Sequence, residues 1–336
     1  MRNFIANLYN GIKLFLKAVF IPLIEMRSYL KYSLLILVGA VPAVFSTRVF
    51  PEPVTSCEDY SLPDPYKVDR SAPKIIPGME LVWNDEFDVD GKPDPANWGF
   101  EYGFVRNREL QWYQPQNAYC LSGELIIEGR KEKIDNPNYN PQNGDWRAKR
   151  EFAGYSSSSI TTRGLQEWNS FGYYEIRAKI DTSCGAWPAI WMLGKNAAWP
   201  HCGEIDIMEF YRIENRPSIL ANAAWGSDRK YKASWDTEIY PLADFLNLDP
   251  DWTNKYHTWS MKWNETAIRL YVDGSMLNEI LLSETLNPGG GNPFTGSNSY
   301  YLILNLALGS NGGDPSETEF PVKYRVDYVR VYKVKN

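Results

Sequence analysis

Three carboxylates within six residues are the feature of the sequence that most clearly suggests chemistry. Glu204, Asp206 and Glu209 stand in the run Glu-Ile-Asp-Ile-Met-Glu, whose other members are apolar. Alternate side chains of a strand share a face, so Glu204 and Asp206 point the same way and Glu209 the other way. A β-bulge at Ile207 and Met208 would return Glu209 to the face of the other two acids. We therefore predict a bulged strand with all three acids on one surface.

The expected spacing of these acids suits glycoside hydrolysis. Four effective strand steps of ~3.3 Å place the backbones of Glu204 and Glu209 ~13 Å apart. Side chains that reach toward each other bring the carboxyl groups to about 5 to 6 Å, near the ~5 to 5.5 Å of a retaining glycosidase. Such a pair can supply a nucleophile and an acid/base. A solvated strand face and a cation site are the alternative interpretations.

Tryptophan is abundant, with thirteen in the chain. Sugar rings stack on aromatic planes, while amide and charged side chains reach the hydroxyls. Trp83 and Trp263 are typical of core positions. Seven further tryptophans are candidates for contact with sugar: Trp98, Trp112, Trp187, Trp191, Trp199, Trp225 and Trp235. Of these, we expect those nearest the acids in sequence to line a concave sugar-binding face.

The elements that must position these residues are strands. After residue 78, short alternating runs bounded by Gly, Asn, Asp and Pro recur, and helical periodicity is scarce. Asp273-Gly274 is a two-residue hairpin signal. Residues 131–150 are polar and predict a long surface loop over one end of a cleft. These patterns favour one all-β domain, a β-sandwich of jelly-roll type, with strands near residues 80–83, 123–129, 157–162, 172–180, 187–193, 204–210, 218–225, 257–263, 267–272, 301–307 and 324–334.

The N-terminal residues have a different character. Residues 1–46 hold five Lys or Arg and one Glu, and the apolar run 34–45 fits the core of a signal peptide better than a membrane span. We expect a signal or membrane-targeting segment at 1–46, a linker at 47–77 and a catalytic domain at 78–336. A lipobox-like sequence ending at Cys57 is a second option, which would attach the protein to a membrane through a lipid.

The net charge of the chain bears on the class of partner. The segment 1–46 is net +4, so the rest of the chain carries −10, which argues against a nucleic-acid partner. We expect an exported monomer that is secreted, periplasmic or on the outer cell surface.

The four cysteines match no zinc pattern. Cys184 and Cys202 could pair, and buried free thiols are the alternative; the other two cysteines are Cys57 and Cys120.

The run Gly203 to Phe210 resembles the E-x-D-x-x-E signature of family 16 glycoside hydrolases in its bulged, laminarinase-like form. The resemblance covers about residues 79 to 335. Other segments agree in order and spacing: Asn-Arg-Glu-Leu-Gln-Trp-Tyr at 107–113, Phe-Gly-Tyr-Tyr-Glu-Ile-Arg-Ala-Lys at 171–179, Trp-Pro-Ala-Ile-Trp-Met-Leu at 187–193, Leu-Ile-Leu-Asn-Leu-Ala at 302–307 and Asp-Tyr-Val-Arg-Val-Tyr at 327–332.

The resemblance implies a concanavalin-like jelly roll with a concave substrate cleft. It implies Glu204 as nucleophile, Glu209 as acid/base and Asp206 as the residue that orients the nucleophile, with no cofactor for catalysis. Two nearby anions would raise the pKa of Glu209 and keep it protonated near neutral pH. We expect the polysaccharide to be bound by Arg106, Glu109, Trp112, Trp187, Trp191, Asn222, Trp225 and Asn305.

Two further family features bear on this chain. The family often carries a structural Ca²⁺, for which Glu86 and Asp327 are the matching candidates. Laminarinases commonly have H-G-T-x-H on the strand after the catalytic one, and residues 219–225 of this chain lack it. His201 or His257 would then have to compensate, so the identity of the sugar is open.

The sequence therefore predicts an exported retaining endo-glycosidase acting on β-1,3- or mixed β-1,3/1,4-glucans. The first alternative is an endo-hydrolase of algal galactans such as agarose, porphyran or carrageenan. The second is a glycan-binding jelly roll without catalysis, which would not need three intact acids.

Overall fold

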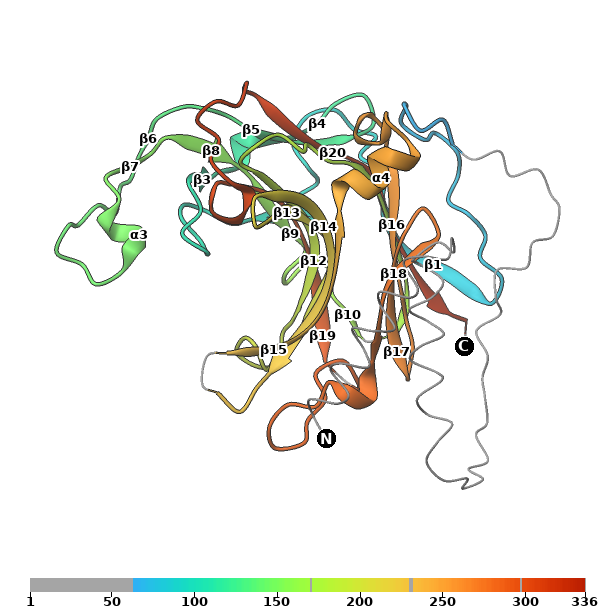
Figure 1. Ribbon diagram of the computed structural model, residues 1–336. Helices are drawn as coiled ribbons and strands as arrows, with labels where there is room; N and C mark the ends of the chain where they lie inside the picture. The colour runs from blue at the N-terminus through green and yellow to red at the C-terminus, as the bar shows by residue number, and fades with distance from the viewer. Residues whose placement is uncertain (1–62, 170, 230–231, 297, 336) are drawn as a thin grey trace, which may run out of the picture. The chain divides into compact units, whose positions relative to one another are not determined.

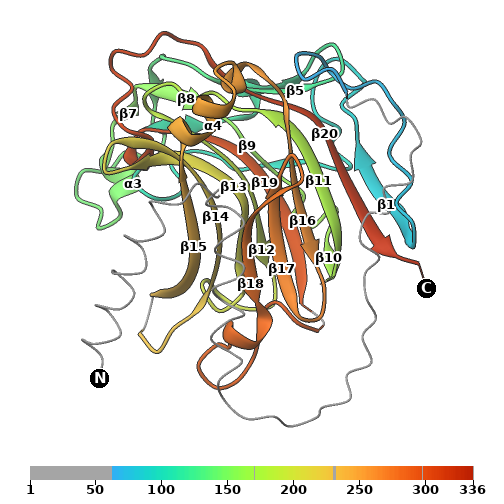
Figure 2. The ribbon, with the colours of Figure 1, turned by 45° about the vertical axis from the view of Figure 1, so that its right-hand side comes forward.

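The computed structural model describes residues 63–169, 171–229, 232–296 and 298–335, and within them the chain forms two large antiparallel sheets stacked face to face (Figures 1 and 2). This confirms the predicted all-β sandwich. The segment 1–46 and the cysteine of the lipobox-like sequence lie outside the described residues. Within the described part, no helix is both long and apolar enough to cross a membrane.

The outer sheet carries the C-terminal strand near its middle. Its order is β18-β17-β16-β11-β20-β5-β4, and β1 also pairs with β20. Its strands are β1 (Met79–Asp85), β4 (Ala118–Cys120), β5 (Leu125–Gly129), β11 (Gly172–Lys179), β16 (His257–Trp263), β17 (Ala267–Val272), β18 (Ser275–Leu281) and β20 (Val322–Val334).

The second sheet carries the acidic run on a central strand. Its order is β15-β14-β13-β12-β19-β9-β2, and β10 also pairs with β19. Its strands are β2 (Gly99–Phe100), β9 (Ser159–Thr161), β10 (Trp168–Asn169), β12 (Ala186–Gly194), β13 (Glu204–Ile213), β14 (Arg216–Gly226), β15 (Ala233–Pro241) and β19 (Ser299–Leu308). In Figure 1 strands β12 to β15 bow away from the outer sheet, so we call this the concave sheet.

Short elements complete the described part. Two small sheets pair β3 (Gln111–Tyr113) with β8 (Tyr155–Ser157) and β6 (Ile134–Asp135) with β7 (Phe152–Ala153). The helices are α3 (Trp146–Lys149), α4 (Leu242–Leu248) and the 3₁₀ turns η2 (Pro115–Asn117), η3 (Trp252–Asn254), η4 (Leu282–Glu284) and η5 (Ser310–Gly312).

The core lies between the two sheets and follows strand alternation. On β16 the fully buried Trp259, Met261 and Trp263 point inward, and the intervening Lys262 stays half-exposed. The predicted core position of Trp263 is confirmed. The predicted hairpin at Asp273-Gly274 is also present, with φ of 49° and 78° between β17 and β18, which matches a two-residue turn with both φ values positive.

The polar loop expected at 131–150 is partly ordered. Strand β6 pairs with β7 at its base, and Asp145 caps the short helix α3 by accepting a hydrogen bond from the Arg147 amide at 3.0 Å. Figure 1 shows this segment projecting from one end of the sandwich. We call residues 131–153 the insertion lobe.

The described part of the expected linker, residues 63–77, is bound to the outer sheet. Arg177 on β11 donates to the carbonyls of Asp64 and Lys67, both at 2.8 Å. The amide of Asp69 donates to Asp327 on β20 at 2.9 Å. From residue 63 onward the chain therefore belongs to the packed domain rather than to a free tether.

The pairing of Cys184 with Cys202, one of the two alternatives for these cysteines, is not present. Both are free thiols, and Cys184 is exposed whereas Cys202 is buried. Cys120 is also a buried free thiol. The alternative interpretation, that the cysteines are buried free thiols, therefore holds for Cys120 and Cys202.

Candidate active site

Strand β13 contains the predicted bulge. Asp206 pairs with Asn222 on β14, and Glu209 pairs with Leu220, so three steps on β13 match two on its neighbour. Ile207 and Met208, between the acids, both point into the core between the sheets. The extra residue returns Glu209 to the concave face, and the three acids share one surface as expected.

The neighbours of these acids follow from the strand register. Glu204 lies opposite Ala224, which in turn lies opposite Trp235 on β15. Asp206 lies between Asn222 and Trp191 of β12. The side chains next to the acids thus come from strands that flank β13 on both sides, and they form the concave face.

Each glutamate is held by a tryptophan side chain. Trp199 Nε1 donates to Glu204 Oε2 at 2.6 Å, and Trp187 Nε1 donates to Glu209 Oε1 at 3.1 Å. Asn222 Nδ2 donates to both Asp206 Oδ2 at 3.2 Å and Glu209 Oε2 at 3.1 Å. These bonds restrict the carboxyl groups to defined positions on the sheet.

Burial and mutual charge tune the acids differently. Burial, and next the charge of Glu204, raise the pKa of Glu209 to about 8. Burial is thus the largest cause; of the two anions expected to contribute, Glu204 does so, and the second is Glu109 rather than Asp206. Burial, followed by the charges of Glu209 and Glu204, raises the pKa of Asp206 well above its usual value, and Asp206 also hydrogen-bonds Glu204. That bond favours ionised Glu204 with the proton on Asp206.

Arg106 supplies the nearest positive charge. It forms an ion pair with Glu101, and its guanidinium carbon lies 4.9 Å from the centre of the Trp191 ring. Burial raises the pKa of Glu204, and the bond from Trp199 and the charge of Arg106 oppose that rise. Arg106 therefore favours the ionised form of Glu204 that a nucleophile requires.

Asn305 and Glu109 belong to a buried network beside the acids. Asn305 accepts a hydrogen bond from Trp191 Nε1 at 2.7 Å and donates to the Tyr113 hydroxyl at 3.1 Å. Glu109 is 3% exposed and accepts from Gln111 at 2.7 Å. Both residues fix the positions of neighbouring side chains through these hydrogen bonds. Burial raises the pKa of Glu109.

The structure does not bring Trp225 to the acids. Trp225 is three residues from Asn222 on β14. Because β14 pairs with β15 without a bulge, this odd spacing places the two side chains on opposite faces of the sheet. Trp225 packs against the core instead. The expectation that Trp225 contacts substrate is therefore wrong, and Trp235, next to Ala224 in the register, takes the corresponding place on the concave face.

Three other residues considered for the site have neighbours other than the acids. Trp112 packs edge-on against Phe104, with ring centres 5.4 Å apart, and is half-buried beside the insertion lobe. His257 is buried on the outer sheet, stacked on Trp252 and bonded to Asp273. His257 therefore cannot replace the missing family histidine. Trp98 is also core, 2% exposed and bonded to Asp85.

Some site residues were not singled out by the sequence. Trp199 and Trp235 were only two of many tryptophans, yet they are 46% and 48% exposed. The position of Trp199 five residues before Glu204 was the available signal. Tyr113 lay in the family-like segment 107–113 without an assigned role, and Glu101 was not marked at all; their partners Asn305 and Ser159 are distant in the chain.

Glu86 and Asp327 do not fit a shared Ca²⁺ site. Glu86 accepts two hydrogen bonds from Arg330, at 2.9 and 2.8 Å, and Asp327 is ion-paired with the buried Arg177. Each carboxylate is thus already paired with the positive charge of an arginine, which occupies the oxygens that would have to bind Ca²⁺. Among the described residues, no group of three or more His, Cys, Asp or Glu is placed to hold a metal.

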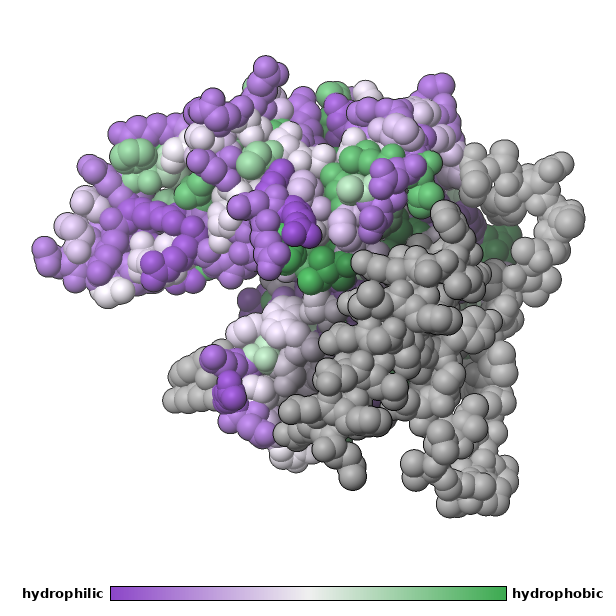
Figure 3. Space-filling model, in the orientation of Figure 1, coloured by the Kyte–Doolittle hydropathy of each residue, from purple (hydrophilic) through white to green (hydrophobic). Residues whose placement is uncertain are grey.

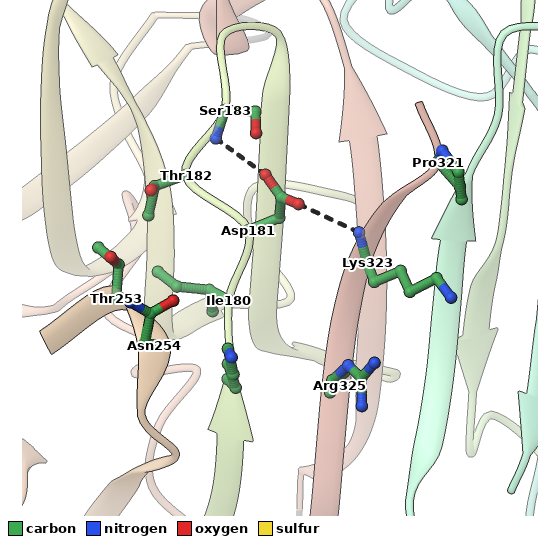
Figure 4. A pocket seen from close by; sticks show the side chains of 10 residues that line it. Ile180, Asp181, Thr182, Ser183, Thr253, Asn254, Pro321, Lys323 and Arg325 are labelled. Atoms are coloured by element: carbon green, nitrogen blue, oxygen red, sulfur yellow. Dashed lines mark hydrogen bonds between the residues drawn. The ribbon is translucent and has the colours of Figure 1, made fainter. Parts of the chain in front are cut away.

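The surface beside the concave sheet is hollowed. Figure 3 shows an indentation between the hydrophilic upper lobe and the lower part of the concave sheet. A separate pocket of about 330 Å³ contains none of the three acids, and its basic residues Lys323 and Arg325 face Glu128 and Glu124. Figure 4 shows this pocket, lined by Lys179, Ile180, Asp181, Thr182, Ser183, Thr253, Asn254, Pro321, Lys323 and Arg325.

The raised pKa of Glu209 predicts a pH profile. An acid must be protonated to donate, so kcat/KM should fall as pH rises through about 8. The Asn222 bond opposes this rise in pKa, so Asn222→Ala should move the basic limb to higher pH. Rates measured from pH 4 to 10 for both proteins test this, and a basic limb that moves to lower pH would contradict it.

The comparisons with known proteins agree with this geometry. Residues 129–330 match the family model described as glycosyl hydrolases family 16. A β-glucanase from Rhodothermus marinus is 33% identical over 275 residues, which cover 76% of this chain and 86% of that protein.

Two solved structures are similar to the chain. One, reported with endo-acting O-glycanases that initiate mucin breakdown in the human gut microbiota, has a TM-score of 0.70 at 33% identity, covering 79% of this chain and 94% of the other. The laminarinase catalytic domain of Thermotoga petrophila RKU-1 has a TM-score of 0.63 at 34% identity, covering 77% and 99%. The family match, the identity to the β-glucanase and the three acids on one concave face together place this chain in family 16 of the glycoside hydrolases.

Proposed function

We propose that this glycoside hydrolase is an exported, retaining endo-hydrolase of β-1,3- or mixed β-1,3/1,4-glucans. The observation that supports the mechanism is the unequal tuning of two glutamates on one face. Burial raises the pKa of both glutamates, that of Glu209 to about 8, but only at Glu204 does a positive charge, that of Arg106, oppose the rise. One carboxyl can hold a proton at neutral pH while the other is ionised.

In the first step, Glu204 attacks the anomeric carbon and forms a glycosyl ester. The bond to the leaving oxygen breaks, and Glu209 gives that oxygen its proton. Asp206 donates a hydrogen bond to Glu204 and orients it. In the second step, Glu209 takes a proton from water, which attacks the anomeric carbon and releases Glu204.

The change of role of Glu209 follows from electrostatics. The charge of Glu204 is the second cause of the raised pKa of Glu209. Esterification removes that charge, so the pKa of Glu209 falls in the intermediate and the residue becomes a better proton acceptor.

Glucan as substrate is supported by the relatives and by the exposed aromatic residues. The similar proteins named above include a β-glucanase and a laminarinase. Trp199 and Trp235 lie on the same side as Glu204, and both rings are nearly half exposed. Such rings can stack against successive glucose units.

A glycan other than glucan is the second candidate. On β14 the chain presents Asn222 and Ala224 toward the acids, without the histidines of the laminarinase pattern. The structure reported with mucin O-glycanases shares the fold at the highest of the TM-scores given above. Galactans and O-glycans therefore belong in the test.

The test is incubation of the purified protein with laminarin, barley mixed-linkage glucan, agarose, carrageenan and mucin. We expect oligosaccharides of several lengths from the two glucans, with the β-anomer appearing first by NMR. An α-anomer as first product would refute retention. Cleavage of a galactan or mucin but of neither glucan would refute the glucan assignment.

A further inference from the structure

The rim where residues 104–110 meet the insertion lobe is unusually basic for this chain. These two segments contain seven lysines and arginines against five acids, whereas the whole chain carries −6. Figure 3 shows the upper lobe as a mostly hydrophilic overhang above the hollow. The two segments are joined by hydrogen bonds from Arg147 and Arg150 of the lobe to carbonyls of residues 105, 108 and 109, so their positive residues share one part of the surface.

Arginines of the lobe hold a strained turn at this rim. Arg150 donates to the carbonyl of Arg108 at 2.7 Å and to that of Glu109, and Arg147 donates to the carbonyl of Val105 at 3.1 Å. Within the turn, Asn107 and Arg108 have φ of 52° and 55°. Non-glycine residues in this backbone region are strained and persist only where their surroundings enforce them. The turn leaves the side chain of Arg108 exposed.

The charges of this rim are not balanced. Arg106 is paired with Glu101, and Arg147 with Asp145. Among the described contacts, neither Arg108 nor Arg150 has a carboxylate partner. Burial, and next the charge of Arg108, lower the pKa of Arg150, and the nearby charge of Glu109 only partly opposes this. Two neighbouring guanidinium groups repel each other, and an anion between them would relieve that repulsion.

Aromatic rings lie beside one of these arginines, Arg150. The guanidinium carbon of Arg150 is 4.8 Å from the ring centre of Phe104 and 4.7 Å from that of Trp146. Trp112 packs on the other side of Phe104, and both tryptophans are partly exposed. The rim thus combines positive charge with flat apolar surfaces, the two features that bind a charged sugar.

We propose that Arg108 and Arg150 form a subsite for an anionic substituent, a sulfate ester or a carboxylate, on the glycan that enters the cleft. Guanidinium groups bind both kinds of anion through paired hydrogen bonds. The link to the acids is Arg106, two residues before Arg108, which covers Trp191 next to Asp206. The subsite rests on the proposed glycoside hydrolase function and specifies which glycans the cleft prefers.

The test measures binding to matched glycans in a Glu204→Gln background, so that no substrate is consumed. The ligands are laminarin, sparsely sulfated laminarin, carboxymethylated β-1,3-glucan, carrageenan and desulfated carrageenan. We expect about tenfold tighter binding of the anionic member of a pair, since a hydrogen bond to a charged group contributes roughly 1.5 kcal/mol or more. The advantage should shrink as salt rises from 0.05 to about 0.5 M.

Variants assign the effect to the rim. Arg108→Gln should remove most of the preference, and Arg108→Lys should keep part of it. Arg70→Gln, at an exposed arginine of the segment bound to the outer sheet, is the matched control and should leave the preference unchanged. The sulfated and carboxymethylated glucans separate a sulfate site from one that takes any anion.

The outcomes separate this inference from the proposed function. If neutral and anionic glucans bind equally and the active protein cuts both, the subsite is wrong and the glucanase function stands. If glucans do not bind but carrageenan binds better than its desulfated form, the glucan assignment fails and the subsite stands. Equal binding within every pair, or a preference that survives Arg108→Gln, overturns the subsite.

Discussion

Glu204→Gln is expected to lower kcat on the preferred polysaccharide by on the order of 10⁴-fold or more, as removal of a catalytic nucleophile does in other hydrolases. The amide keeps the size of the side chain but cannot form the glycosyl ester. It can still accept a hydrogen bond from Trp199. Affinity for polysaccharide should therefore remain, and steady-state rates together with affinity electrophoresis measure the two effects.

The matched control for this variant is Glu265→Gln. Glu265 is exposed in the turn between β16 and β17 on the outer sheet, far in the fold from β13. It should keep full activity. Full activity of Glu204→Gln with unchanged product anomers would instead exclude Glu204 as the nucleophile.

Glu209→Ala is expected to reduce kcat on polysaccharide by about 10² to 10⁴-fold, the range for loss of a general acid. The reason is specific to the leaving group. A sugar oxygen needs the proton of Glu209, whereas a dinitrophenolate leaves without one. Aryl glycosides with such a leaving group should therefore form the intermediate at nearly the normal rate, and hydrolysis of that intermediate should become slow.

Azide provides the sharpest readout for this variant. It needs no general base, so it should attack the glycosyl ester in the space vacated by Glu209 and give a β-glycosyl azide. Its formation restores turnover in proportion to azide concentration and reports retention through the product's anomeric configuration. Absence of rescue, with equal losses on aryl glycoside and polysaccharide, would contradict the acid/base role.

The pH behaviour links the two variants. In the parent protein the basic limb near pH 8 should reflect Glu209. Because the charge of Glu204 raises the pKa of Glu209, Glu204→Gln should lower that pKa. The residual activity of the variant should therefore begin to fall at a lower pH than the activity of the parent protein. A series of rates measured across pH on the variant tests this.

Strand prediction succeeded where the pattern was local. The alternation on β13, with core-facing Ile205 and Phe210 on either side of the bulge, could be read from neighbouring letters. Strand β15 was missed because its residues Asp236, Thr237 and Glu238 look like a polar loop. It is an edge strand with one face open to solvent, so it needs few apolar residues. Missing β15 also concealed the position of Trp235.

The tryptophan expectations show where local reasoning stops. Trp191 and Trp225 are both flanked by small or apolar residues, yet Trp191 faces the acids and Trp225 faces the core. The difference depends on the bulge in β13 and the unbroken register of β14. Register is fixed by pairing between strands, which a single strand's sequence does not contain.

The expected Ca²⁺ site illustrates the same limit for charges. Glu86 and Asp327 are acids at the family positions, but their neighbours in space are Arg330 and Arg177. Arg177 also binds the carbonyls of the segment that was expected to be a linker. The role of a carboxylate depends on the charged groups that lie next to it in the folded protein, and here those groups are arginines.

By itself the sequence determined the acidic run, its bulge and the all-β class, because strand alternation and its interruption are properties of consecutive residues. The tertiary structure decided which side chains hold the acids, with Trp199 on Glu204 and Trp187 and Asn222 on Glu209. It also decided the protonation of Glu209, since burial beneath the walls of the cleft is the main cause of its raised pKa. The effect of Glu204 on Glu209 could be predicted from the run itself, but burial arises only when distant segments pack together, so no local pattern could have supplied it.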